Sequence, residues 1–310
     1  MRRALVAQLK PYTRKAKPTG VILGSGSFGS VVELVSAGET VAGKVFKNIS
    51  HSHMRPVLDK LCGELILMTQ LNHAHIVQCK GVCFLVDQPL PVLLMERLMT
   101  SLHSYLLDPT HATLAITTKA SFLCDVASGL AYLHNSCTQV IIHRDLTAKN
   151  VLLDSELRAK IADFGNSRIM DLDPEASPET FTSLPGTLEY MPPEAEGGSV
   201  MYDPSLDLFS FGHLALFTAL QTPLQPILPR SYSDATGKMH VRSEIRRRQQ
   251  FVDSASQLFG EKHSLVLLIK QCLHYHPAQR PRTEDLNTKM QKIVKEICNQ
   301  GEGMYTCLCS

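Results

Sequence analysis

The sequence has little excess charge of either sign. Its 310 residues include 31 Lys and Arg and 29 Asp and Glu, which gives a formal net charge of +2. Such a balance creates no strong electrostatic field that would attract nucleic acid or an acidic membrane surface. We therefore expect no nucleic-acid partner, and the composition favours no particular oligomeric state. Internal repeats and low-complexity tracts are also absent from the sequence.

Long apolar runs are absent as well. The most apolar stretch, Leu206–Leu220, is interrupted by Asp207 and His213. It is also shorter than the ~18 consecutive apolar residues that a membrane span needs. The stretch is therefore predicted to be a buried helix, and we expect no membrane association.

The cysteines and the N-terminal residues indicate a cytoplasmic protein. Nine cysteines are scattered without the spacing of a disulfide framework, which is typical of reduced thiols in the cytosol. Residues 1–17 are basic, but their apolar run, Ala4–Leu9, is shorter than the core of a secretory signal. We predict a flexible basic leader over residues 1–17, with an organellar transit peptide as the alternative.

The rest of the chain divides into a strand-rich part and a helical part. Residues 18–97 contain short β-prone runs separated by Gly, Pro and polar residues, and one helix is expected over Met54–Asn72. Residues 98–297 show mainly helical periodicity, and residues 298–310 form a short tail. The predicted fold class is α+β with two lobes. The expected strands are Val21–Leu23, Val31–Val35, Val41–Phe46, Val82–Val86, Val92–Met95, Val151–Leu153 and Lys160–Ala162, and the further helices are Leu114–His134, Leu206–Leu220, Ser243–Leu258, Ser264–Tyr275 and Arg282–Asn299.

A glycine-rich segment, Gly24–Val31, lies near the start of the strand-rich part. Glycines at 24, 26 and 29 allow the backbone to bend sharply and bring N–H groups onto phosphate oxygens. The same pattern would also suit a simple hairpin turn. A dinucleotide-binding fold is disfavoured, because the β-prone run Val31–Val35 follows the glycines where that fold needs a helix.

Two charged residues interrupt segments that are otherwise apolar. Lys44 lies within the run Val41–Phe46, and Glu64 lies on the helix predicted over Met54–Asn72. A buried ammonium is costly unless it is paired. We therefore predict an ion pair between Lys44 and Glu64.

The segments His143–Leu153 and Asp163–Gly165 contain two aspartates and an asparagine beside β-prone runs. Carboxylate and amide oxygens suit Mg²⁺, a hard cation that shares its coordination shell with substrate phosphates. One aspartate can remain free of metal and accept a proton.

With these motifs, in this order from Gly24 to Arg280, the chain resembles the eukaryotic protein kinases, and within them the tyrosine-kinase-like group. The resemblance implies a kinase domain over residues 18–297, with lobes of about 18–97 and 98–297, that uses ATP and Mg²⁺ or Mn²⁺ to phosphorylate protein substrates. It implies that Asp145 accepts the proton of the substrate hydroxyl and that Asn150 and Asp163 bind the metal. It further implies that Lys149 contacts the γ-phosphate, that Lys44 holds the α- and β-phosphates, and that Glu64 orients Lys44. The implied ATP-binding residues are Leu23, Gly24, Ser25, Gly26, Ser27, Phe28, Gly29, Val31, Ala42, Lys44, Met95, Glu96, Arg97, Leu98 and Leu152.

The resemblance also implies residues that hold the site together. Glu194 is expected to pair with Arg280 and anchor the activation segment, and Asp207 to bond the backbone of the catalytic loop. Thr187 is expected to bridge Asp145 and Lys149. His143, Phe164 and Gly165, with Met68, are assigned to the hydrophobic spine and the metal-binding turn, and Phe209 stands where many kinases have Trp.

The motifs disagree about the hydroxyl that accepts phosphate. Lys149, with Thr147 two residues before it, is similar to tyrosine kinases, whereas Gly186-Thr187-Leu188-Glu189-Tyr190 resembles Ser/Thr kinases. We predict Ser/Thr specificity, with tyrosine or dual specificity as the alternative. A pseudokinase scaffold is a further alternative, because Gly43, Thr147 and Pro192 depart from the usual pattern.

Other features are given regulatory or structural interpretations. Arg144 resembles the arginine of kinases that are activated by phosphorylation, for which Ser177, Thr180, Thr182 and Ser183 are candidate sites. The run Arg246–Arg248 is predicted to be the solvated face of a helix, with docking of an acidic substrate as the alternative. The His and Cys pairs complete no zinc site, and Cys307–Ser310 matches a prenylation signal only formally.

Overall fold

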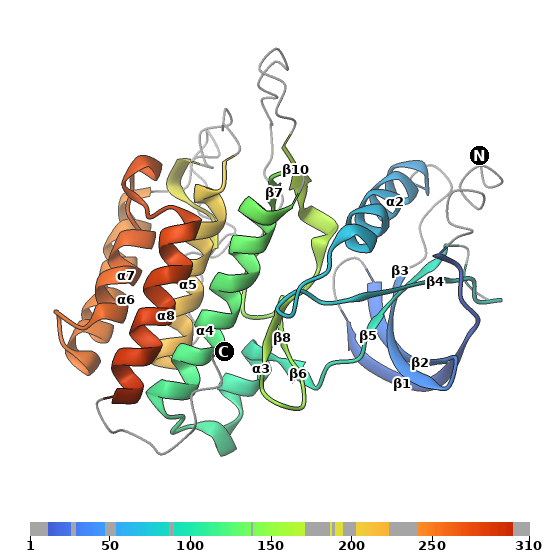
Figure 1. Ribbon diagram of the computed structural model, residues 1–310, viewed down its shortest axis with the longest axis horizontal. Helices are drawn as coiled ribbons and strands as arrows, with labels where there is room; N and C mark the ends of the chain where they lie inside the picture. The colour runs from blue at the N-terminus through green and yellow to red at the C-terminus, as the bar shows by residue number, and fades with distance from the viewer. Residues whose placement is uncertain are drawn as a thin grey trace, which may run out of the picture. The chain divides into compact units, whose positions relative to one another are not determined.

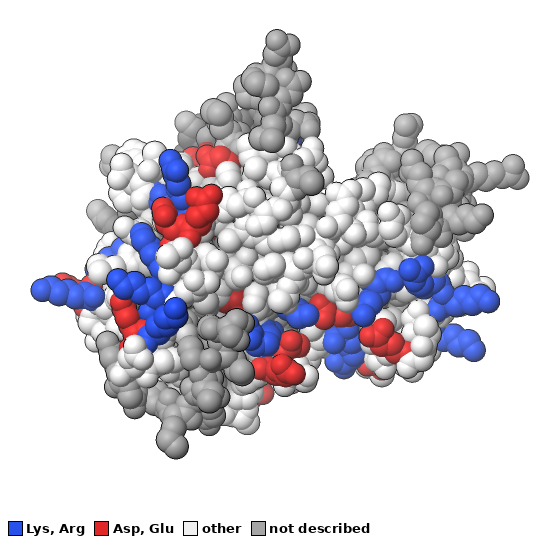
Figure 2. Space-filling model, viewed as in Figure 1, with Lys and Arg blue, Asp and Glu red and all other residues white. Residues whose placement is uncertain are grey.

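The structure is a computed structural model in which two compact units, Met1–Met99 and Thr100–Ser310, are each described by themselves (Figure 1). Within residues 54–60 and 241–247 only the backbone is described. The described residues are 12–25, 29–46, 54–86, 88, 90–137, 139–170, 187, 190–194, 203–222 and 241–299. On the face drawn in Figure 2, Lys and Arg side chains lie among Asp and Glu side chains.

The first unit is built on an antiparallel sheet of five strands in the order β1-β2-β3-β5-β4. One helix, α2 (Met54–Gln70), contacts β4 (Figure 1). The strands are β1 (Ala16–Ser25), β2 (Gly29–Ser36), β3 (Glu39–Phe46), β4 (Cys79–Cys83) and β5 (Val92–Glu96). The predicted small lobe of strands with one main helix is confirmed.

The sheet is held together by a tightly packed apolar cluster that includes Leu34, Val41 and Val92. Gly43 lies among these residues on β3, opposite Val32 on β2 and Leu94 on β5. A Cβ atom at Gly43 would collide with the side chains of Leu34 and Val92. The glycine inside the lysine-bearing strand is therefore explained by close packing, since a well-packed core does not accept an added methyl group without strain.

The N-terminal end of this unit departs from the expected boundary. The first strand begins at Ala16, inside the segment predicted as a leader, and Thr13 forms a parallel bridge with Val82. The backbone N–H of Arg14 donates to the Val82 carbonyl at 2.7 Å. Sequence patterning did not reveal this pairing because Tyr12–Lys15 lacks the alternation of a strand. Residues 1–11 of the predicted leader lie outside the described residues.

The second unit is mainly helical. In it α4 packs against α5 and α8, and α5 also contacts α6 and α7 (Figure 1). The helix α5 is buried from Leu206 through Ala219, as predicted for the most apolar stretch. Among the described residues, no helix is both long and apolar enough to cross a membrane. The helices are α3 (Leu102–Leu107), α4 (Ile116–Ala131), α5 (Ser205–Leu220), α6 (Val241–Phe259), α7 (Ser264–Cys272) and α8 (Thr283–Asn299), with a π-helical turn over Tyr132–Ser136.

Two small sheets in this unit fix the loops that carry polar residues. One has the order β6-β8-β9 and the other pairs β10 with β7. Their strands are β6 (Thr100–Ser101), β7 (Ile141–Ile142), β8 (Val151–Leu153), β9 (Ala159–Ile161) and β10 (Arg168–Ile169). The loop between β7 and β8 holds residues 143–150, and the loop between β9 and β10 holds residues 162–167. Both loops are thus tied at each end to a strand.

Candidate active site

Lys44 and Glu64 form the predicted ion pair within the first unit. Lys44 Nζ donates to Glu64 Oε1 at 2.7 Å and to Oε2 at 3.1 Å. The side chain of Glu64 is 3% exposed and that of Lys44 15% exposed, so both charges are largely removed from water. Strand β3 supplies the lysine and α2 supplies the glutamate. An ammonium held in this way presents a fixed positive charge, which suits phosphate oxygens.

The first unit also brings together several residues assigned to ATP binding. Val31 on β2 lies opposite Gly24 on β1 and Lys44 on β3, and Ala42 lies opposite Met95 on β5. These residues are therefore neighbours in the sheet although they are far apart in the sequence. Leu23 lies on β1 beside Gly24.

The glycine-rich segment is described only at its two ends. At Gly29 a Cβ atom would collide with the backbone carbonyl oxygen of Val45, so the close approach of β2 and β3 requires a glycine there. The hydroxyls of Ser25 and Ser30 lie 3.2 Å apart across the hairpin. The predicted phosphate-contacting residues Gly26, Ser27 and Phe28 lie outside the described residues.

The hinge predicted at residues 96–98 follows β5. The Glu96 backbone N–H donates to the Gln78 carbonyl at 3.0 Å, and the Gln78 backbone N–H donates to the Glu96 carboxylate at 2.7 Å. Arg97 donates to Glu33 Oε2 at 2.8 Å and to the Leu98 carbonyl at 2.8 Å. These bonds fix the backbone of the hinge against β2 and the residues before β4.

In the second unit, the loop between β7 and β8 centres on Asp145. The Asn150 amide donates to the Asp145 backbone carbonyl at 2.8 Å and to its Oδ2 at 3.2 Å. Asn150 thereby keeps its own side-chain oxygen available for a cation. Lys149 is exposed on the same loop, and its charge contributes to the lowered pKa of His103, after the larger effect of burial.

Asp163 lies in the loop between β9 and β10 with a left-handed backbone conformation, φ 63° and ψ 73°. This conformation is costly for a residue other than glycine and is typical of functional sites. Behind it, Phe164 is buried and packs edge-on against His143 at 5.2 Å between ring centres. His143 Nε2 also donates to the Ala162 carbonyl at 3.0 Å, so His143 contacts the second loop both at Phe164 and at Ala162.

Asp207 on α5 holds the backbone of the first loop, as predicted. Its Oδ2 accepts from the His143 N–H at 2.7 Å and its Oδ1 from the Arg144 N–H at 2.8 Å. Burial alone would raise the pKa of Asp207, but the hydrogen bond and charge of His134, with His143, hold the pKa below its ordinary value. The Arg144 backbone is left-handed, with φ 65°. These bonds stabilise the unusual backbone of the loop.

Two further residues of this network, His134 and Asn166, were not predicted. His134, in the π-helical turn, donates from Nε2 to Asp207 Oδ2 at 2.8 Å, and its Nδ1 lies 2.8 Å from the Thr283 hydroxyl. Asn166 donates to Asp145 Oδ2 at 3.3 Å, while its carbonyl accepts from Arg144 Nε at 2.5 Å. A histidine at the end of the predicted helix Leu114–His134, next to an apolar run, was the available sequence signal for His134.

Thr187 is bonded to the loop between β7 and β8. Its hydroxyl donates to Asp145 Oδ1 at 2.9 Å and its backbone N–H to the same oxygen at 3.0 Å. The predicted contact with Asp145 is therefore present, and the contact with Lys149 stays a prediction. The candidate phosphorylation sites Ser177, Thr180, Thr182 and Ser183 lie outside the described residues.

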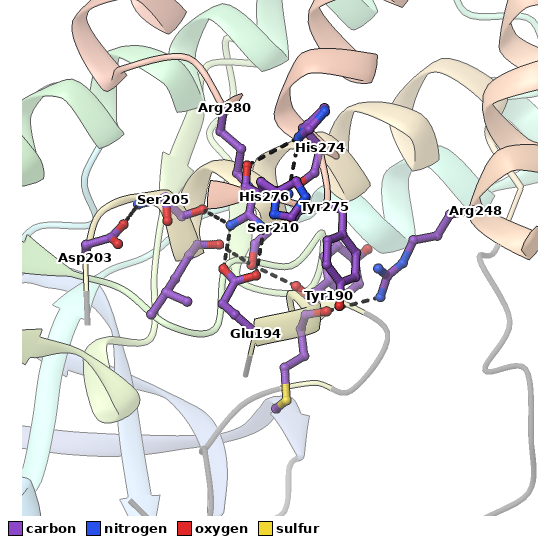
Figure 3. Close-up of polar contacts among 12 residues, drawn as sticks. Tyr190, Glu194, Asp203, Ser205, Ser210, Arg248, His274, Tyr275, His276 and Arg280 are labelled. Atoms are coloured by element: carbon purple, nitrogen blue, oxygen red, sulfur yellow. Dashed lines mark hydrogen bonds and ion pairs between the residues drawn. The ribbon is translucent and has the colours of Figure 1, made fainter. Parts of the chain in front are cut away.

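Glu194 and Arg280 form the predicted anchor, with two parallel bonds of 2.6 and 2.8 Å (Figure 3). The Arg280 side chain also donates to the backbone carbonyls of His274, Ser205 and Tyr275. A guanidinium has five N–H donors, and these five bonds use all of them. The end of the segment is thus fixed to the helical core.

Arg248 corrects the prediction for the run Arg246–Arg248. Its side chain is buried, at 8% exposure, with the guanidinium 4.7 Å from the centre of the Phe209 ring. The solvated-face interpretation is therefore wrong for Arg248, because an arginine can stack its planar cation on an aromatic ring and donate to a carbonyl in the core. The side chains of Arg246 and Arg247 lie outside the described residues.

His213 is a buried polar residue on α5 that the sequence pattern did not explain. Both of its ring nitrogens lack a hydrogen-bond partner among the residues that the structure describes. Burial, and then the nearby charge of Arg248, lower its pKa well below the ordinary value. The ring is therefore neutral near pH 7 and packs beside Phe209 and Tyr190.

The donor set fits a hard divalent cation whose shell is completed by phosphate. Asn150 offers an amide oxygen and Asp163 a carboxylate that is partly exposed. Within the described ranges there is no group of three His, Cys, Asp or Glu residues that could hold a metal unaided. A Mg²⁺ site that relies on substrate oxygens has this composition. The histidine pairs act locally, since the His75 and His276 N–H groups donate to His73 and His274 Nδ1.

Comparison with known proteins agrees with this geometry. Residues 18–291 match the family model described as "Protein kinase domain". The chain is 35% identical over 294 residues to "Wall-associated receptor kinase-like 20" of Arabidopsis thaliana, covering 90% of this chain and 44% of the relative. It is 30% identical over 275 residues to "L-type lectin-domain containing receptor kinase S.1" of the same plant, covering 86% and 40%. The chain spans less than half the length of these curated relatives.

Proposed function

This chain belongs to the protein kinase family, and from that membership we propose that it transfers the γ-phosphoryl group of ATP to serine and threonine hydroxyls of protein substrates. The observation that carries the proposal is the formed pair of Lys44 and Glu64 together with the ordered set Asp145, Asn150 and Asp163. A pseudokinase normally lacks at least one of these groups.

Each part of this set has a distinct task in phosphoryl transfer. The reaction passes through a loose, charge-rich transition state, so positioning and electrostatic stabilisation supply most of the catalysis. Lys44, held by Glu64, binds the α- and β-phosphates, and Lys149 lies exposed on its loop to meet the γ-phosphate. Asn150 and Asp163 would hold Mg²⁺, which neutralises charge on the phosphate oxygens when it is bound.

Asp145 orients the substrate hydroxyl and accepts its proton. Its carboxylate is fixed by Asn150 and Asn166 on Oδ2 and by Thr187 on Oδ1. Side chains of three residues hold the carboxylate in one orientation, which lowers the entropic cost of aligning the hydroxyl for attack. The aspartate is only partly buried, so a substrate hydroxyl can reach it.

The bond between Thr187 and Asp145 supports Ser/Thr specificity. Thr187 belongs to the Gly-Thr-x-x-Tyr pattern that resembles Ser/Thr kinases. Its hydroxyl and its backbone N–H both donate to Asp145 Oδ1. The Thr147 side chain, at the position that suggested tyrosine specificity, is 3% exposed. Thr147 therefore packs in the core of the loop and offers little surface to a substrate.

The test compares wild type with Asp145→Asn in the presence of Mg²⁺, radiolabelled ATP and a degenerate peptide library with one fixed Ser, Thr or Tyr. We expect wild type to label the Ser and Thr libraries and the variant to lose at least ~100-fold in rate. Asp154→Asn serves as the matched control, since Asp154 lies on a turn where it accepts bonds only from neighbouring backbone. Equal labelling by wild type and Asp145→Asn, or preferential labelling of Tyr, would contradict the proposal.

A cytoplasmic location is part of the same proposal. All seven cysteines that the structure describes are free thiols, which favours a reducing compartment. Burial raises the pKa of the Cys83 thiol to about 11 and that of Cys272 to about 12, so neither is prone to oxidation. Expression of a fluorescent fusion would test the location, and a secreted or organellar signal would refute it.

A further inference from the structure

Thr187 and residues 190–194 lie close in sequence, and contacts fix them at two points. In this segment, Thr187 is bound to Asp145 and Glu194 to Arg280. Between these ends, the Tyr190 carbonyl accepts from the Ser210 hydroxyl at 3.0 Å. Because Thr187 bonds the Asp145 carboxylate, the residues that flank a hydroxyl bound at Asp145 lie near Thr187.

Arg248 holds the middle of the same segment. Its Nη2 donates to the Met191 carbonyl at 3.2 Å, and Figure 3 shows its side chain extending from α6 toward Tyr190. It is the only arginine of its helix whose side chain is described, and that side chain is buried. Burying a guanidinium is unfavourable unless it is stacked and hydrogen-bonded, and both kinds of contact are present here.

Phe209 links this contact to the anchor at Arg280. The guanidinium carbons of Arg248 and Arg280 lie 4.7 and 4.8 Å from the centre of the same aromatic ring. The Phe209 side chain is fully buried on α5. The ring therefore gives the two arginines a common support, and each arginine grips the segment at a different point, Met191 or Glu194.

We propose that Arg248 is a positioning residue for the protein substrate: by holding the Met191 carbonyl it fixes the surface that meets the residues flanking the phosphorylated hydroxyl. This inference rests on the proposed kinase function. Arg248 acts through Met191 and makes no bond to Lys44, Asp145, Asn150 or Asp163 among the described contacts. Its loss should therefore weaken peptide binding while ATP binding and the chemical step persist.

The experiment measures steady-state kinetics with the best-phosphorylated peptide from the Ser/Thr library. Arg248→Met keeps the length of the apolar stem but removes the cation and the donors, while Arg248→Lys keeps a cation and a donor without the planar face. Gln250→Ala, at an exposed position of the same helix, is the matched control. Thermal unfolding of each protein is recorded alongside, and if Arg248→Met does not fold, Arg248→Lys provides the test.

We expect Arg248→Met to raise the KM for peptide roughly tenfold, equivalent to ~1.4 kcal/mol, with kcat and the KM for ATP within about twofold of wild type. Arg248→Lys should give an intermediate KM, and Gln250→Ala the wild-type value. A peptide KM unchanged in Arg248→Met would overturn the inference. So would a fall in kcat at constant KM, which is the signature of a merely smaller folded fraction. An inactive wild type would instead overturn the proposed function, and this inference with it.

Discussion

His213 makes the stability of the second unit depend on pH in a predictable direction. Its imidazole is buried at 3% exposure, has no described hydrogen-bond partner and lies near the charge of Arg248. Burial first, and Arg248 second, hold its folded-state pKa well below the unfolded value of 6.5. We consider the replacement His213→Leu, which fills a similar volume with an apolar side chain and suits a helix.

The sign and the size of the effect follow from proton linkage. Above pH 6.5 the ring is neutral in both the folded and the unfolded protein, so His213 adds no pH dependence. Below pH 6.5 the unfolded chain binds a proton that the folded chain resists, so stability falls as the pH falls, by at most ~1.4 kcal/mol per pH unit. Between pH 6.5 and 5.0 the loss from this one residue is up to ~2 kcal/mol.

Urea unfolding of wild type and His213→Leu at pH 7.5, 6.5, 5.5 and 5.0 measures this loss. The difference between the two free energies of unfolding isolates His213, because His73 and His103, whose pKa values are also lowered by burial, are common to both proteins. We expect the variant to gain on wild type only below pH 6.5. The exposed replacement His276→Gln should keep the wild-type dependence. Parallel curves for wild type and His213→Leu across the whole range would refute the reasoning.

Three further changes test other contacts. Glu64→Gln leaves Lys44 without its carboxylate partner and should lower kcat/KM for ATP roughly tenfold or more, since this pair must be in place for transfer; unchanged kinetics would count against the assigned role. Gly43→Ala introduces a Cβ into the packed β2–β3–β5 core and should cost ~1–3 kcal/mol in urea unfolding, whereas a neutral result would mean that the cluster relaxes. Asp207→Asn replaces one of two carboxylate oxygens, each of which accepts from a backbone N–H, with an NH₂ donor and should cost about 3 kcal/mol; a wild-type midpoint would be the contrary outcome.

Sequence patterning located most of the regular elements because the spacing of their apolar residues is a local property of the sequence. The helix over Met54–Gln70 repeats its apolar residues at helical spacing, and the strand Val151–Leu153 was predicted with its observed bounds. The strand expected over Val82–Val86 lies at Cys79–Cys83 instead. Its start was not predicted, because Lys80 and Gly81 interrupt the apolar pattern there. The short helix α3 (Leu102–Leu107) was missed, because six residues are too few for periodicity to emerge.

The candidate site also contains some contacts that the sequence predicted and others that it did not. Lys44 with Glu64, and Glu194 with Arg280, were predicted because a charge in an apolar run needs a partner and because their motifs resemble those of kinases. The role of Arg248 was not predictable in this way. Whether an arginine in a polar helix is solvated or buried depends on what packs against it, and Phe209 and Met191 come from distant parts of the chain. Tertiary contact of that kind leaves no signal in local composition.

The three departures from the family pattern bear on whether the chain is a catalyst or a scaffold. Gly43 is required by the close packing of Leu34 and Val92, and leaves the Lys44–Glu64 pair formed. Thr147 is buried, and its carbonyl accepts from the N–H of Asn150 at 3.0 Å, which helps to place the residue that we propose as a metal ligand. Pro192 is buried, and the carbonyl of the preceding residue, Met191, accepts a hydrogen bond from Arg248 at 3.2 Å. Packing or a hydrogen bond thus accommodates each substitution, and the side chains proposed to bind phosphate and metal stay in place. This arrangement favours an active kinase over a scaffold.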